Sequence, residues 1–109
     1  MLSLAERNFL KKFYALLDEH LADESFAVEN MSRALGIGEA KLYAKVKTLT
    51  GQTPKAFFVT YRMNKAMELL KSGEFTVSEV GYKVGATSPA VFSRSFKHQF
   101  GISPSSVKE

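Results

Sequence analysis

The chain has 109 residues, a length typical of one small domain. Hydrophobic residues make up 45% and charged residues 24% of it, an ordinary globular balance. It contains no cysteine, which excludes a disulfide framework, a thiolate nucleophile and a cysteine-ligated zinc site. The longest strictly apolar run, residues 56–59, is too short to span a bilayer, and no signal-peptide pattern follows Met1. We therefore expect a soluble cytoplasmic protein.

The net charge of +4 is unevenly distributed along the chain. Residues 1–27 carry a net charge of −2, whereas residues 28–109 carry +6. A basic body indicates a polyanionic partner. The competing interpretation is that these lysines only keep the protein soluble.

Capping residues, glycines and apolar spacing predict a series of helices. Ser3 and Glu6 have the spacing of a capping box, and Thr76 and Glu79 repeat it. Prolines follow capping residues at Pro54, Pro89 and Pro104, where a first helical turn tolerates them. The predicted helices cover, in chain order, about 4–22, 28–35, 39–50, 54–71, 76–85 and 89–100, with a last helical turn from 103. No segment alternates as a strand would, so we predict an all-α fold of about seven helices.

An internal repeat relates residues 28–54 to residues 77–104. Val28 and Gly36 match Val77 and Gly85 at an offset of 49. At an offset of 50, four further residues match, namely Ala40, Lys47, Gly51 and Pro54 with Ala90, Lys97, Gly101 and Pro104. The second copy therefore has one extra residue in its turn.

Each copy consists of a short helix, a turn with glycine and a longer helix, which is the layout of a helix-turn-helix. We predict a single domain, 1–109, made of two such subdomains: a first unit at about 4–51, a connecting helix at about 54–71 and a second unit at about 76–106. A helical-hairpin repeat packed only for stability is the alternative, although two copies are too few for a solenoid.

Several ordered motifs resemble the DNA-binding domain of the AraC/XylS family of bacterial transcription regulators. They are Leu-Tyr-Ala-Lys-Val-Lys-Thr-Leu-Thr-Gly-Gln-Thr-Pro at 42–54, Arg-Met-Asn-Lys-Ala-Met-Glu-Leu-Leu at 62–70, Val-Ser-Glu-Val-Gly-Tyr-Lys-Val-Gly at 77–85, Phe-Ser-Arg-Ser-Phe-Lys at 92–97 and Gly-Ile-Ser-Pro at 101–104. The resemblance covers about 8–106. Phe26, Val28 and residues 49–52 are also similar to the C-terminal output domains of Bacteroidetes hybrid two-component regulators, while a stand-alone or response-regulator origin stays open.

The resemblance implies sequence-specific binding of double-stranded DNA, with the second helix of each unit in successive major grooves. The connecting helix, about 27 Å long at 1.5 Å per residue, is commensurate with the roughly 34 Å repeat of the duplex. The implied partners are double-stranded DNA and either RNA polymerase or a sensor or receiver region on the same or another chain. If the chain belongs to a hybrid sensor, it is the cytoplasmic end of a membrane protein. No enzyme activity, cofactor, metal or small-molecule ligand is expected.

Family roles carried over by position give two sets of candidate contacts. The expected base contacts are Glu39, Ala40, Tyr43 and Ala44 in the first unit and Pro89, Ala90, Ser93 and Arg94 in the second. The expected phosphate contacts are Lys41, Lys45, Lys47 and Lys97, because a flexible ammonium neutralises charge without fixing geometry. Arg94 is the foremost reader, since arginine can bond two guanine acceptors at once. A phosphate contact for Arg94, burial of Tyr43 and simple solvation of the lysines are the alternatives.

Four residues depart from the family pattern. Ala44 stands where the family usually has Arg, and Gly38 where it has a capping Ser, so we expect the first unit to be poor in direct readers. Gly81 replaces a usual Ala and Ala86 a usual Phe, so we expect a less stable second unit. These departures give some weight to a second function, a degenerate helix-turn-helix module that binds another protein.

Overall fold

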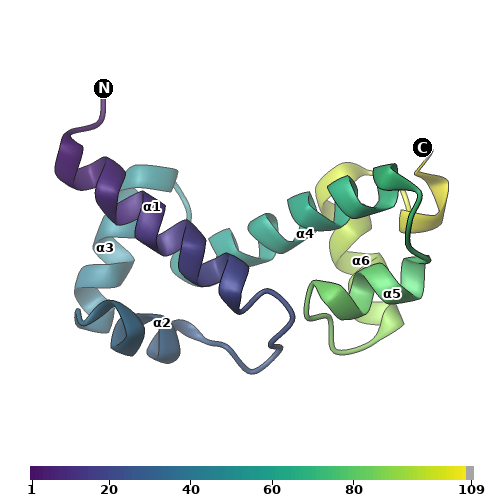
Figure 1. Cartoon of the computed structure of the whole chain (residues 1–109), viewed down its shortest axis with the longest axis horizontal. Helices are drawn as coiled ribbons and strands as arrows, with labels where there is room; N and C mark the ends of the chain where they lie inside the picture. The colour runs from purple at the N-terminus through teal and green to yellow at the C-terminus, as the bar shows by residue number, and fades with distance from the viewer. Residues whose placement is uncertain (108–109) are drawn as a thin grey trace. The chain divides into compact units, whose positions relative to one another are not determined.

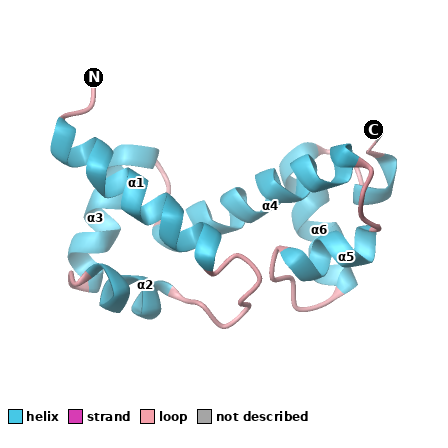
Figure 2. Cartoon of the chain, in the orientation of Figure 1, coloured by secondary structure: helices cyan, strands magenta, loops and turns pink. Residues whose placement is uncertain are grey.

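The computed structural model describes residues 1–107, and all regular structure in that range is helical (Figures 1 and 2). Its elements are α1 (Leu4–Glu19), α2 (Val28–Leu35), α3 (Glu39–Thr50), α4 (Pro54–Ser72), α5 (Val77–Lys83), α6 (Pro89–Phe100) and the 3₁₀ turn η1 (Pro104–Ser106). The prediction of an all-α chain with about seven helices is confirmed. The last two residues of the predicted domain, 108 and 109, lie outside the described residues.

The predicted capping boxes are present at the starts of α1 and α5. The Glu6 amide donates to Ser3 Oγ over 3.1 Å, and the Ser3 amide donates to Glu6 Oε1 over 2.8 Å. Thr76 and Glu79 make the same pair of bonds at 3.1 and 2.9 Å. The bond from the Ser3 amide, with a smaller contribution from its hydroxyl, holds the pKa of the Glu6 carboxyl below its ordinary value of 4.5. The Thr76 amide and hydroxyl lower the pKa of Glu79 in the same way.

The first helix ends at Glu19, so its predicted extension to about residue 22 is wrong. His20 forms the C-cap, and its ring stacks on Phe26 with centroids 3.9 Å apart and planes inclined by 1°. The carbonyls of Leu21 and Asp23 accept hydrogen bonds from the Arg62 side chain. Apolar spacing alone could not show that these interactions would divert residues 20–24 from the helix.

The chain forms two compact units, and the division falls within α4. The first unit comprises residues 1–20 and 25–58, and the second comprises residues 21–24 and the chain from 59 onward. The short segment Leu21–Glu24 thus belongs to the second unit although it directly follows α1.

Aromatic and aliphatic side chains from α1 to the start of α4 fill the core of the first unit. Phe13 is fully buried, and its ring lies 5.7 Å from that of Phe57, measured between centroids. The buried apolar residues of this unit are Leu10, Phe13, Leu17, Phe26, Met31, Leu42, Val46, Pro54 and Phe58. The burial of apolar surface in this core makes the main contribution to the stability of the unit, at about 25 cal/mol per Å².

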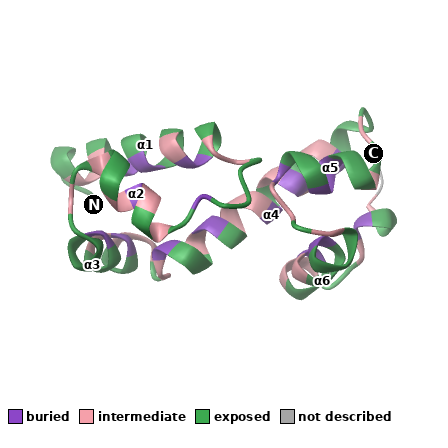
Figure 3. Ribbon diagram, turned by 90° about the horizontal axis from the view of Figure 1, so that it is seen from below, coloured by how far each residue is buried: buried purple, intermediate pink, exposed green. Residues whose placement is uncertain are grey.

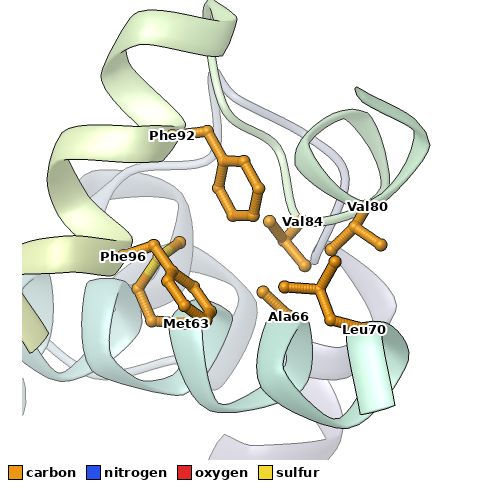
Figure 4. Close-up of a cluster of buried hydrophobic side chains, with 7 residues drawn as sticks. All are labelled: Met63, Ala66, Leu70, Val80, Val84, Phe92 and Phe96. Atoms are coloured by element: carbon orange, nitrogen blue, oxygen red, sulfur yellow. The ribbon is translucent and has the colours of Figure 1, made fainter. Parts of the chain in front are cut away.

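The core of the second unit gathers side chains from three helices (Figure 4). Met63, Ala66 and Leu70 lie on α4, Val80 and Val84 belong to α5 and its C-cap, and Phe92 and Phe96 lie on α6. Leu21 packs against this cluster as a partly buried residue. The core therefore fixes α5 and α6 on α4 within the unit.

Candidate nucleic-acid interface

Each unit contains a pair of packed helices joined by a short turn: α2 with α3 in the first, and α5 with α6 in the second. The turns use Gly36 and Gly85, whose φ angles of 68° and 74° lie in the left-handed region that favours glycine. In the first turn, the Ser32 hydroxyl donates to the Ile37 carbonyl over 2.5 Å. This is the helix-turn-helix arrangement that the repeat predicted.

The second helices of the two pairs have the same pattern of exposure. Over all twelve positions, α3 and α6 carry the same order of exposed, intermediate and buried residues. Figure 3 shows that both helices have buried and exposed parts. Leu42 and Val46 are the buried pair of α3, and Phe92 and Phe96 are that of α6. Each helix therefore buries one stripe in its own unit and exposes the opposite face.

The predicted contact residues of the first unit lie on the exposed face of α3, with one exception. Glu39, Ala40, Lys41, Tyr43, Ala44 and Lys47 are exposed. Tyr43 is 50% exposed, which excludes the alternative that it is buried against the first helix. Lys45 is half-buried, with Nζ 5.1 Å from the Phe9 ring centroid. This cation–π contact gives Lys45 a structural partner that the sequence did not indicate.

The predicted contact residues of the second unit are all exposed: Pro89, Ala90, Ser93, Arg94 and Lys97. Within residues 1–107, Arg94 and Lys97 take part in no ion pair, and α6 contains no acidic residue. Ser88 caps the helix by accepting a hydrogen bond from the Val91 amide over 3.2 Å. The outer face of α6 therefore offers two available cations, a hydroxyl and no opposing charge.

The face of α3 differs from that of α6 at its start. Gly38 is the N-cap, with φ −69° and ψ 158°, and it offers no side chain to the first turn. Glu39 places a carboxylate in that turn, and Ala40 and Ala44 offer no hydrogen-bonding side chain. That the first unit is poorer in direct readers of bases than the second stays a prediction.

A hydrogen-bond network that the sequence did not reveal supports the second turn. Arg62 Nε donates to the Leu21 carbonyl over 3.1 Å, and Arg62 Nη2 donates to the Asp23 carbonyl over 2.7 Å. Burial lowers the pKa of Arg62, and the nearby Asp23 carboxylate partly opposes this. A Cβ on Gly85 would lie 2.7 Å from the Leu21 carbonyl oxygen and 2.8 Å from Arg62 Nη2. Glycine is therefore required at position 85 both by its positive φ angle and by the close approach of the Leu21 carbonyl and the Arg62 side chain.

A hollow of about 210 Å³ opens between α5 and α6. We call it the α5–α6 hollow; its lining includes Gly81 and Tyr82 of α5, Ala86 and Thr87 of the turn, and Phe92 and Ser93 of α6. A Cβ on Gly81 would lie 3.1 Å from Phe92 Cδ2, so Gly81 lets the Phe92 ring sit close against α5. Gly81 thus has a packing role in addition to the helix weakening expected from the sequence. The expected lower stability of the second unit stays a prediction.

Within residues 1–107, no group of three or more His, Cys, Asp or Glu residues is arranged to hold a metal ion. In the same range, no helix has the length and apolar character that a membrane crossing requires.

Two helix-turn-helix units with exposed second helices place this chain among the helix-turn-helix proteins. A family model described as a helix-turn-helix domain matches residues 31–109, most of the chain. The chain belongs to this family and, within it, to the AraC type, as the sequence motifs indicated.

Known proteins resemble nearly the whole chain. It is 33% identical over 104 residues to histidine kinase P4 of Formosa agariphila and 32% identical over 102 residues to the HTH-type transcriptional regulator YidL of Escherichia coli K12. These alignments cover 95% and 94% of this chain but 8% and 34% of the relatives, so the chain spans at most about a third of their length. The solved DNA-binding domain of AdpA, a global transcriptional factor in complex with a target DNA, is 29% identical with a TM-score of 0.79, over 88% of this chain and 86% of that one.

Proposed function

We propose that this chain is a transcription-regulator module that binds double-stranded DNA sequence-specifically, with α3 and α6 in successive major grooves. The matched exposed faces of α3 and α6 carry this proposal, because a recognition helix must bury one stripe and offer the other to base edges. The AdpA DNA-binding domain, crystallised with its target DNA, supports it by likeness. The module binds and does not catalyse.

The two units have unequal roles in this proposal. Arg94 and Ser93 hydrogen-bond base edges, and Pro89 and Ala90 bring the start of α6 close to the groove. In the first unit, Glu39, Ala40, Tyr43 and Ala44 read fewer hydrogen-bonding groups and rely more on apolar contact with thymine methyl groups and on DNA shape. Lys41, Lys47 and Lys97 neutralise phosphates, and Lys45 adds charge from its place over Phe9.

The two recognition helices lie in the two predicted units of one chain, at about 4–51 and 76–106. A connecting helix at about 54–71 joins these units. The signal comes from a sensor or receiver region on the same or another chain, and the kinase named among the relatives supports a two-component origin. RNA polymerase is the expected protein partner of the bound module. The site of action is the cytoplasm, where bacterial DNA lies.

A salt titration of binding to a random-sequence duplex tests the proposal. We expect the logarithm of the binding constant to fall linearly with that of the salt concentration, with a slope that corresponds to about four to eight neutralised phosphates. The measurement is fluorescence anisotropy of a labelled duplex at a series of salt concentrations. A flat response would contradict DNA binding and favour the protein-interaction module. The exposed Glu39 and Ala44 on α3 are the residues that favour this second function.

A further inference from the structure

The α5–α6 hollow lies beside residues that the proposed function places against DNA. Ser93 and Pro89 form part of its wall, and both are exposed on the outer face of α6. The hollow exists where the chain has Ala86 in place of the bulky residue usual in the family, and it reaches in to the buried ring of Phe92. It is therefore an indentation at the start of a recognition helix, and this chain's own residue choice leaves it open.

The lining of the hollow indicates the chemistry of its occupant. Among the described residues, no charged side chain lines it; its floor is apolar, with Gly81, Ala86 and Phe92, and its rim carries hydroxyl groups such as those of Thr87 and Ser93. A phosphate would find no cation in it. An apolar group that enters gains by leaving water, and a hydroxyl rim tolerates the polar edges beside that group.

Duplex DNA offers one apolar group in the major groove, the methyl of thymine. We propose that the α5–α6 hollow receives the methyl-bearing edge of one thymine and so makes the second unit select that base. This inference depends on the proposed function, since it requires α6 to lie in a major groove. It assigns to Ala86 and the hollow a selectivity that adds to the hydrogen bonds proposed for Arg94.

Replacement of single thymines by deoxyuridine tests the inference, because it removes the methyl and leaves every hydrogen-bonding group in place. A preferred duplex is first selected from a random library with the full chain. We expect one deoxyuridine replacement to weaken binding about fourfold, the effect of burying one methyl-sized group. In Ala86→Phe, whose ring fills the hollow, the ratio between the thymine and deoxyuridine duplexes should fall to near one.

A matched variant and a second route into the hollow make the test independent of folding. Ile37→Phe introduces the same side chain at the corresponding turn position of the first unit and should keep the fourfold ratio. Ser78→Leu enters the hollow from an exposed position on α5 and should also reduce the ratio between the two duplexes. It replaces Ala86→Phe in the test if the thermal transition of Ala86→Phe shows that this variant does not fold. Absence of any thymine with this effect, or its persistence in both hollow variants, would overturn the inference. If the library yields no preferred sequence at all, the proposed function itself is contradicted.

Discussion

Arg94 combines exposure with freedom from ion pairing within residues 1–107, and the two together suit it to reading a base. Replacement of Arg94 by alanine removes the planar guanidinium group, which can bond two acceptors of guanine at once. We expect Arg94→Ala to weaken binding to the preferred duplex by roughly 1–3 kcal/mol and to relax preference at one base pair. Repeating the site selection with the variant measures both effects.

Lys97→Ala is the matched control on the same helix face. It should weaken binding to all sequences alike and reduce the salt slope by about one. If Arg94→Ala behaves as Lys97→Ala does, then Arg94 contacts phosphate, as in the alternative weighed from the sequence.

For single residues, the sequence indicated the candidate contact residues better than it indicated the contacts that support their helices. The exposed positions of α3 and α6 followed from helical spacing and the repeat, and the structure agrees with them except at Lys45, which is half-buried. The partners of Arg62 did not follow, because its bonds join residues 39 and 41 positions apart through backbone carbonyls. A backbone acceptor carries no sequence signature, so such a contact is visible only in the fold.

At the scale of the helix, α3 and α6 differ most in how they begin. Ser88 caps α6 through its hydroxyl, whereas Gly38 leaves the first turn of α3 without a side-chain partner. Gly38 already has the extended backbone of an N-cap, and a Cβ there would meet nothing within 4 Å. We expect Gly38→Ser to raise the free energy of unfolding by about 0.5–1 kcal/mol through the new cap bond and a less flexible unfolded chain.

Denaturant unfolding followed by circular dichroism measures this change. Ser88→Gly is the reciprocal variant and should lower stability by a few tenths of a kcal/mol. An unchanged or lowered stability in Gly38→Ser would mean that the start of α3 is limited by something other than its cap.

The helices themselves were largely predictable, because local signals and the fold agree along most of the chain. Glycines end α2, α3 and α6 as predicted, at Gly36, Gly51 and Gly101, and Pro89 begins α6. The end of α1 was the exception, since its apolar spacing continues to Leu21 while that residue joins the core of the second unit. The α5–α6 hollow did not follow from the sequence, which showed only the small residue Ala86, because its shape depends on where Phe92 lies.

For the molecule as a whole, two units on one chain predict that DNA recognition depends on spacing. We expect the selected duplex to contain two half-sites, and an insertion of five base pairs between them to move one half-site by about half a turn. Affinity should then fall towards that of a single half-site, because the gain from tethering is lost when both cannot bind together. Competition between the original and the lengthened duplex measures the loss.

An insertion of ten base pairs restores the rotational phase and serves as the control for length alone. Equal affinity for all three duplexes would show that one unit accounts for recognition, and we would expect it to be the second, whose helix α6 carries Arg94.

The second unit takes residues 21–24 from a stretch of chain that precedes α2 and α3. It therefore cannot be excised by a single cut: a fragment that starts at residue 59 would carry Arg62 and Gly85 without the carbonyls that Arg62 binds. The same arrangement limits recombination between related genes. A crossover between the two units would combine the second unit of one parent with residues 21–24 of the other. We therefore expect the two copies of the repeat to be exchanged between related proteins only together.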